Sequence, residues 1–216
     1  MASNAVLTWT PKLGENHWLK LMGGWNIENM DYTSTLGQNT GVIDPEHPSL
    51  SLTDGELPKA QGNGSYSASL VGTFFRVNYG YKGKYLVEVS GRYDGNSKFP
   101  SNQRWGFFPS ASVGWRISEE PFMAGAKSWL DNLKIRASFG STGNGQVDNY
   151  LFLSKIAIKK NLGFLTGDSP LIYADKPSLI PDGLTWETVS TYDLGLDWEM
   201  LNGRLSIVAD IYRKNT

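Results

Sequence analysis

The fold is indicated most clearly by a stretch that reads Asp131-Asn-Leu-Lys-Ile-Arg-Ala-Ser-Phe-Gly-Ser141. Its apolar members recur at every second position, and charged or small residues stand between them. Leu133, Ile135, Ala137 and Phe139 therefore fall on one side of an extended chain. Because successive side chains of a β-strand point to opposite faces, this alternation predicts a strand with one apolar and one polar face.

The same period of two recurs along the chain, whereas helical periodicity is nearly absent. The segments that show it are 4–10, 18–28, 66–81, 84–94, 105–117, 131–141, 189–200 and 204–213. Most run for about 10–14 residues, which is longer than the strands usual in globular sheets. We therefore predict an all-β fold, an antiparallel meander of about eight long strands.

The connections between these segments alternate in length. The short ones lie near 11–16, 82–84, 118–130 and 202–203, and the last contains Asn202-Gly203, a signal for a type I′ hairpin. The long ones are 33–64, 95–104 and 142–186. A meander through an outer membrane has tight periplasmic turns and long outer loops, so we expect the three long connections to be external.

The composition agrees with a membrane barrel. The chain has 216 residues with 24 glycines, and 12% of it is aromatic although only 40% is hydrophobic. No stretch approaches 18 consecutive apolar residues, so no transmembrane helix is expected. The formal net charge of −1 gives no indication of nucleic-acid binding, and the absence of cysteine excludes disulfides.

Aromatic residues are expected in two rows, one at each end of the strands, as at the two interfaces of a membrane. We place one row near the short turns, at Tyr79, Tyr81, Tyr85, Trp115 and Trp198. We place the other near the long connections, at Tyr32, Tyr93, Trp105, Phe107 and Tyr212.

Small residues on the polar face bear on the size of the barrel. An eight-stranded barrel is narrow, and side chains must fill its interior. Many inward positions here are too small for that: Gly72, Gly106, Ser112, Gly114, Ser138, Gly140 and Gly195. We expect part of a large transmembrane β-barrel; the alternatives are a soluble all-β carbohydrate-binding module and a small self-contained membrane barrel.

A series of motifs carries a family resemblance over roughly residues 65–216. The motifs are Phe75-Arg-Val-Asn-Tyr79, Tyr85-Leu-Val-Glu-Val-Ser-Gly-Arg-Tyr-Asp-Gly-Asn-Ser-Lys-Phe99, Arg104-Trp-Gly-Phe-Phe-Pro-Ser-Ala-Ser-Val-Gly-Trp-Arg-Ile-Ser-Glu-Glu-Pro-Phe122, Trp129-Leu-Asp-Asn-Leu-Lys-Ile-Arg-Ala-Ser-Phe-Gly-Ser-Thr-Gly-Asn144, Leu184-Thr-Trp-Glu-Thr188, Leu194-Gly-Leu-Asp197 and Asn202-Gly-Arg-Leu205. Together they resemble the SusC/RagA family of TonB-linked outer-membrane proteins, and residues 1–216 are interpreted as a partial TonB-dependent receptor β-barrel.

The resemblance implies a function and partners. Such proteins are large plugged barrels of about 22 strands. They import oligosaccharides or peptides with energy relayed by the TonB complex, under a SusD-like surface lipoprotein. We expect this chain to contact membrane lipid, the remaining barrel and the plug. Because it contains no plug region and no TonB box, we expect a fragment that does not transport alone.

We expect no catalytic, cofactor-binding or metal site, and no enzyme. Asp193 and Asp197 share a strand face but stand about 13 Å apart, too far for a catalytic pair. His17 and His47 lack neighbouring ligands. The run Gly140–Gly145 resembles a phosphate loop but lacks the Lys-Ser/Thr ending, so it is interpreted as a strand end and a turn.

Three further features give weaker indications. Asn63-Gly64-Ser65 suggests a turn, and Pro109, which lacks a backbone donor, suggests a local irregularity within its strand. Loop aromatics can pack against one another or bind a carbohydrate, and packing is the favoured interpretation. They are Tyr150, Phe152, Phe164, Tyr173 and Trp186, and the substrate-binding residues remain unknown at this stage.

Overall fold

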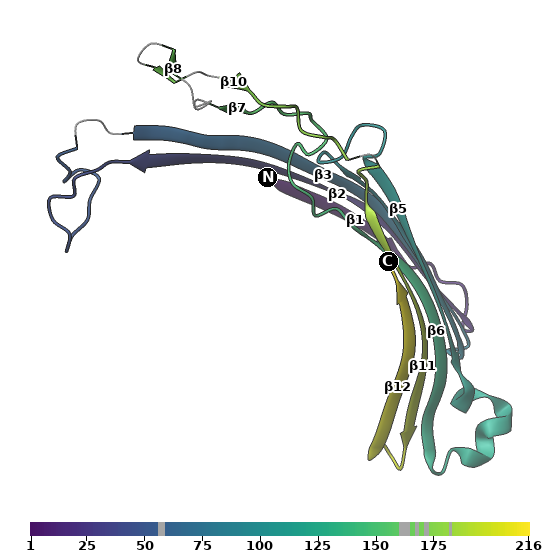
Figure 1. Ribbon diagram of the computed structural model, residues 1–216. Helices are drawn as coiled ribbons and strands as arrows, with labels where there is room; N and C mark the ends of the chain where they lie inside the picture. The colour runs from purple at the N-terminus through teal and green to yellow at the C-terminus, as the bar shows by residue number, and fades with distance from the viewer. Residues whose placement is uncertain (56–58, 160–164, 167–168, 171–172, 182) are drawn as a thin grey trace.

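Eight long strands form one open, curved antiparallel sheet in the computed structural model of the chain (Figure 1). The structure describes residues 1–55, 59–159, 165–166, 169–170, 173–181 and 183–216. The strands are β1 (Ala2–Trp9), β2 (His17–Gln38), β3 (Lys59–Tyr81), β4 (Tyr85–Asn96), β5 (Trp105–Arg116), β6 (Leu130–Asn144), β11 (Glu187–Met200) and β12 (Leu205–Asn215). The all-β fold and the eight-stranded meander are confirmed.

The order of strands in the sheet is β1-β2-β3-β4-β5-β6-β11-β12. Each strand of the sheet therefore pairs with the next one along the chain, except that the connection from β6 to β11 contains further short strands. They are the two-residue strands β7 (Ile158–Lys159), β8 (Leu165–Thr166), β9 (Ser169–Pro170) and β10 (Tyr173–Ala174). These pair as β10 with β7 and β8 with β9, apart from the main sheet.

The hairpin of β2 and β3 is longer than the sequence predicts. Residues 33–38 and 59–64, expected in a loop, belong to these strands, so the connection is 39–58 and the hairpin reaches beyond its neighbours (Figure 1). Apolar and polar residues do not alternate along these two strand ends, in which Leu36 is the one large apolar residue, and a two-stranded ladder needs no such alternation to form. The other two long connections, 97–104 and 145–186, are two to three residues shorter than expected at the strand ends.

The turn expected at Asn63-Gly64-Ser65 is wrong, because these residues lie within β3. Ser34 pairs with Gly64 and Thr35 with Gly62, so the register shifts and the intervening residue is a bulge. Gly64 has a φ of +115°, which an L side chain rarely adopts.

The short connections lie at the end of the sheet opposite the three long connections. Asn202 and Gly203 have φ values of 56° and 75°, and the Leu201 carbonyl accepts a hydrogen bond from the Arg204 N–H at 3.3 Å. Two positive φ values at the centre of a turn are what type I′ requires. Leu201 also has a positive φ, 60°, and residues 201–204 separate β11 from β12, so this turn lies within a four-residue loop. The connection between β5 and β6 contains two 3-10 helices, η1 (Ile117–Glu119) and η2 (Pro121–Ala126). No helix in the described ranges is long and apolar enough to cross a membrane.

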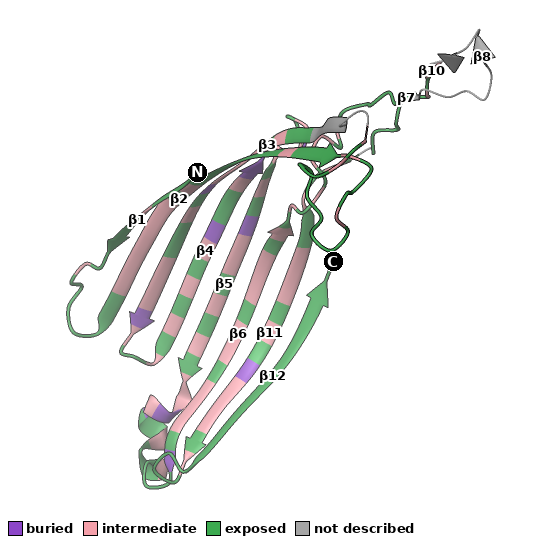
Figure 2. Cartoon of the chain, turned by 90° about the vertical axis from the view of Figure 1, so that its left-hand side faces the viewer, coloured by how far each residue is buried: buried purple, intermediate pink, exposed green. Residues whose placement is uncertain are grey.

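The strand register assembles the apolar rows into one continuous face. Val87 pairs with Val113, Val113 with Ala137, Ala137 with Leu194 and Leu194 with Ile211, across five strands. We call this side the outer face, and the opposite side, which carries the charged residues, the polar face. Exposed and half-buried positions alternate along β4 and β5 (Figure 2).

Within the described ranges, no second layer covers the outer face. Val113 is 54% exposed, Leu194 53% and Ile211 72%. Among the described residues only Phe99, Phe108 and Leu130 are buried hydrophobics. A soluble module would bury its apolar rows against a second sheet or helices. The soluble alternative is therefore not favoured.

The two outermost strands, β1 and β12, do not pair with each other in the described sheet. The chain thus forms an arc and does not close into an eight-stranded barrel (Figure 1). Each outermost strand presents a row of backbone donors and acceptors along one edge, which lipid cannot satisfy. Further strands must pair with both edges in a membrane.

Two details of the predicted strands change. Tyr32 pairs with Tyr66, and Tyr212 pairs with Asp193. Their positions in the strands place Tyr32 and Tyr212 on the polar face, so neither belongs to an aromatic row on the outer face. Pro109 causes no register shift toward β4, where it faces Gly91. The ladder with β6 begins at Ser110, directly after the proline, so the irregularity is the end of that ladder.

A charge on the outer face should destabilise the barrel, whereas the same charge on the polar face should not. Val113→Arg should lower the free energy of unfolding of the complete protein in lipid bilayers by about 2–4 kcal/mol. Ser112→Arg, one residue away on the other face, is the control. Equal destabilisation by the two variants, measured by equilibrium unfolding in phospholipid bilayers, would mean that the faces are assigned wrongly.

Candidate functional site on the polar face

The polar face carries three arginines near its centre, Arg76 on β3, Arg92 on β4 and Arg136 on β6. They lie on this face because they alternate with the apolar residues of the outer rows. Each has at least one carboxylate nearby, but the three environments differ. We take the three arginines and the residues around them as the candidate site, in which their partners distinguish them.

Arg136 joins three strands. Its guanidinium contacts Asp193 at 3.4 Å and Asp197 at 3.3 Å on β11, and it donates a short hydrogen bond to Asp210 on β12. Lys134 lies 3.5 Å from Asp197. The two aspartates considered as a catalytic pair are therefore counter-ions of one arginine.

A glycine makes this reach possible. Gly195 stands between Arg136 and Asp210 in the register, and a Cβ added there would lie 2.5 Å from both Arg136 Cζ and Asp210 Oδ1. The arginine side chain thus crosses β11 in the space that a larger residue would occupy.

Arg92 is arranged in the same way. It donates to both oxygens of Asp94 at 3.0 and 3.1 Å, and to Asn26 on β2 at 3.1 Å. It passes over Gly72, where an added Cβ would lie 3.0 Å from its Nη2 atom. Its guanidinium also lies 5.6 Å from the ring centre of Phe74. From the sequence alone these small residues indicate only a wide barrel, because their contacts with the arginines depend on the register across three strands.

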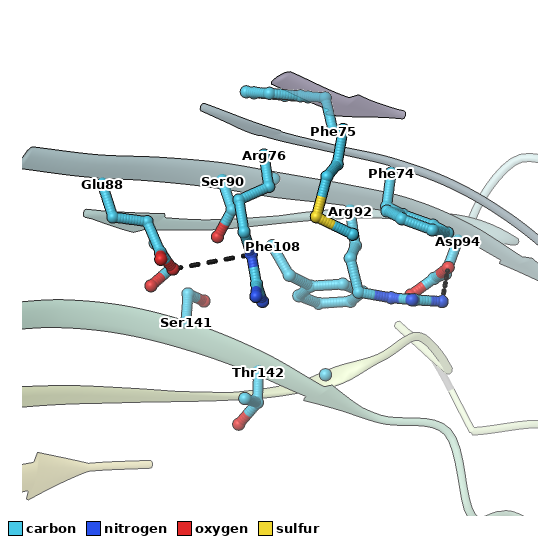
Figure 3. Close-up of a pocket in the computed structure, with 14 residues that line it drawn as sticks. Phe74, Phe75, Arg76, Glu88, Ser90, Arg92, Asp94, Phe108, Ser141 and Thr142 are labelled. Atoms are coloured by element: carbon cyan, nitrogen blue, oxygen red, sulfur yellow. Dashed lines mark hydrogen bonds and ion pairs between the residues drawn. The ribbon is translucent and has the colours of Figure 1, made fainter. Parts of the chain in front are cut away.

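A hollow of about 580 Å³ opens on the polar face over β3, β4 and β5. Its lining includes Arg76, Arg92, Glu88, Ser90 and Ser110. Figure 3 shows the two guanidinium groups reaching into it, each beside a carboxylate. A second hollow of about 490 Å³ lies alongside and shares Glu88 with the first. Both volumes are in the range of small-molecule sites.

The base of the long connection packs against the strands. Trp186 lies with ring centres 5.3 Å from both Phe99 and Phe108, and its indole N–H donates to the Arg104 carbonyl at 2.9 Å. Tyr150 accepts a hydrogen bond from the Ser67 N–H at 3.0 Å. These two loop aromatics are thus engaged within the chain.

The other candidate residues are placed as follows. Tyr173 pairs with Lys159 in the β10–β7 ladder, Phe152 is half-buried, and Phe164 lies outside the described residues. His17 Nδ1 lies 2.8 Å from the Tyr79 hydroxyl, and His47 Nδ1 lies 3.1 Å from Asp44.

Residues 140–144 end strand β6, as predicted for the glycine-rich run. Across the described part of the chain, no group of three or more His, Asp or Glu side chains is placed to hold a metal ion.

Glu120 organises the short-turn end of the outer face. It lies between η1 and η2 and accepts hydrogen bonds from Tyr85 at 2.6 Å, Trp115 at 3.2 Å and Lys84 at 3.2 Å. The hydrogen bond from Tyr85 is the main reason that the pKa of Glu120 is lowered, with Trp115 and Lys84 acting in the same direction against the effect of burial. Aromatic rings at a membrane interface keep a polar edge in water, and here a carboxylate binds those edges.

Comparison with known proteins gives consistent matches along the chain. A family model described as "TonB dependent receptor-like, beta-barrel" matches residues 2–216. TonB-dependent receptor P26 of Formosa agariphila is 30% identical over 98% of this chain, and TonB-dependent receptor SusC of Bacteroides thetaiotaomicron is 33% identical over 68%. The chain spans 21% of the first relative's length and 15% of the second's.

Solved structures show the same fold. A structure described as that of the RagAB peptide transporter matches 98% of this chain with a TM-score of 0.77 at 22% identity, and the match covers 23% of that protein. The RagAB peptide importer in its closed-closed state matches with a TM-score of 0.78, also at 22% identity.

The contact across Gly195 can be measured by a double-mutant cycle. Asp210→Asn should cost roughly 0.5–1 kcal/mol in the native background, because the ion pair is partly exposed. In a Gly195→Ala background the methyl group displaces the guanidinium, so the same change should cost almost nothing. Gly140→Ala, whose added Cβ would lie 3.5 Å from Ser110 Oγ, is the control and should leave the coupling intact. Undiminished coupling in Gly195→Ala would contradict the arrangement.

The lowered pKa of Glu120 predicts a pH dependence of stability. A carboxyl group with a lowered pKa in the folded state stabilises it above the pKa of the unfolded chain, about 4.3, and loses this effect as pH falls through the folded value. Glu120→Gln should flatten the fall in unfolding free energy below about pH 4.3. Exposed Glu15→Gln is the control, and identical pH profiles for native protein and Glu120→Gln would refute the role.

Proposed function

Since the chain belongs to the TonB-dependent receptor-like β-barrel family, we propose that it forms part of the wall of an outer-membrane transporter for nutrients. The observation that carries the proposal is the continuous exposed outer face opposite a charged polar face. A water-filled passage through lipid needs both faces on one sheet. The outer face contacts lipid and the polar face lines the passage.

The long connections define the external side in this proposal. Connections 39–58, 97–104 and 145–186 face outward, toward a SusD-like surface lipoprotein, and the short turns face the periplasm. Strands β1 and β12 pair with the remaining barrel. A plug within the complete barrel contacts the TonB complex, which supplies energy.

The cargo is an oligosaccharide or a peptide. Both classes present hydroxyl, amide or carboxylate groups, and the polar face offers guanidinium, carboxylate and hydroxyl groups over the two hollows. The passage involves binding and release without a covalent step. This chain alone does not transport, because its sheet is open.

Orientation can be tested with single cysteines, since the chain contains none. In intact cells, a membrane-impermeant maleimide should label Glu46→Cys in connection 39–58 but leave Lys82→Cys in the turn between β3 and β4 unlabelled. Both should react after the cells are broken. Labelling only at position 82 would reverse the orientation. Protection of both positions in intact cells, with the protein recovered in the soluble periplasmic fraction, would support the soluble module.

Transport is tested by deleting the receptor gene in its host. Growth on the nutrient mixture that induces the receptor should slow, and a copy lacking β4 to β6 should fail to restore it. Normal growth and uptake of both oligosaccharides and peptides in the deletion strain would contradict the proposed function.

A further inference from the structure

We propose that Arg76 is an anchoring residue for a carboxylate group of the transported ligand, within the hollow over β3, β4 and β5. The inference rests on the proposed function, and it specifies a chemical group that this function leaves open. It comes from a contrast among the three central arginines of the polar face.

Arg92 and Arg136 both bind acceptors of the sheet itself. Each donates hydrogen bonds to a carboxylate nearby, crosses a glycine, and reaches an acceptor two strands away, Asn26 or Asp210. These two arginines stabilise the wall by joining strands, and their hydrogen-bonding capacity is largely used.

Arg76 has no such partners. Its side chain makes no hydrogen bond to a described residue, and its one ionic contact among those residues is Nε to Glu88 Oε1 at 3.5 Å. That distance exceeds the 2.7–3.2 Å of an ordinary N–H···O bond. Glu88 therefore offsets the positive charge of Arg76 without forming paired hydrogen bonds with its guanidinium. The N–H donors on Nη1 and Nη2 of Arg76 remain available.

The register places no carboxylate or amide beside Arg76 in its own row across the strands. The cross-strand neighbours of Arg76 are Met22 on β2 and Ser90 on β4, and the next residues outward are Thr8 and Ser110. None of these is a carboxylate or an amide. The side chain of Arg76 is 49% exposed, and it reaches into the hollow (Figure 3).

A carboxylate is the group best suited to bind the unpaired donors of Arg76. The two terminal nitrogens of a guanidinium match the two oxygens of a planar carboxylate, and the paired hydrogen bonds are charge-assisted. Ser90, Ser110 and Thr142 line the same hollow and add hydroxyl donors. Arg92 and Asp94 already form a closed pair there, so they contribute no excess negative charge against such a ligand.

Two kinds of cargo can supply a carboxylate, a uronic acid within an oligosaccharide or the C-terminus of a peptide. The test uses the complete receptor, purified in detergent, and titration calorimetry with matched probes. One pair is trigalacturonate and its methyl ester. The other is tetra-alanine with a free and with an amidated C-terminus.

The free acid of at least one pair should bind about 10-fold more tightly than its neutralised form. Arg76→Gln should remove that preference while leaving affinity for the neutral form unchanged. Arg76→Lys, which keeps the charge but loses the fork, should restore only part of it. Lys20→Gln is the control, because Lys20 is a polar-face cation outside the hollow.

The pair that shows the preference identifies the source of the carboxylate. An equal affinity for acid and neutral forms, a preference that survives Arg76→Gln, or failure of all four probes to bind overturns the inference. So does a fall in stability and in affinity for every probe alike in Arg76→Gln, since Arg76 would then be an internal counter-ion of the barrel. Growth and cysteine labelling report separately on the proposed function.

Discussion

The structure depends on one constraint: inside a membrane, where there is no water, every backbone N–H and carbonyl group must be hydrogen-bonded within the protein. Hydrocarbon offers no partner for an N–H or a carbonyl, so each strand that crosses it must be paired along both edges. This explains why the strands are long, why consecutive strands pair, and why tight turns join them at one end. It also explains why the sheet cannot end at β1 and β12 in a membrane. Once the strands are paired, side-chain alternation decides which face meets lipid and which meets water.

The polar face is organised by arginines and by the glycines between them. Neighbouring strands of a β-sheet lie close together. A long side chain can therefore reach a residue two strands away only where the strand between them has a glycine on that face. Gly72 and Gly195 provide this space for Arg92 and Arg136. Two of the three central arginines thereby join strands, and Arg76 remains open toward the hollow. The same sheet face thus combines fixed contacts with one group available to a ligand.

Alternation allowed the strands to be predicted because a slip of one residue would turn every side chain to the wrong face. It did not predict the ends of β2 and β3, where apolar and polar residues do not alternate. Tyr212 lies at the predicted end of its strand but on the polar face, which the sequence did not reveal because Val208 on that face of β12 is apolar too. The contacts of Gly195 were beyond prediction, since they depend on which residues of β6 and β12 stand opposite it. The loop cluster of Trp186 likewise joins residues about 80 positions apart, between which the sequence shows no link.

Spin labels can show whether the outer face contacts lipid while the polar face contacts water. Labels placed one at a time at positions 111 to 114 of β5, in the complete receptor in bilayers, would be relaxed by oxygen and by a water-soluble nickel chelate. At 111 and 113 the account predicts strong relaxation by oxygen and little by nickel, and at 112 and 114 the reverse. Uniform access of the nickel chelate to all four positions, or exclusion of both reagents from 111 and 113, would contradict it.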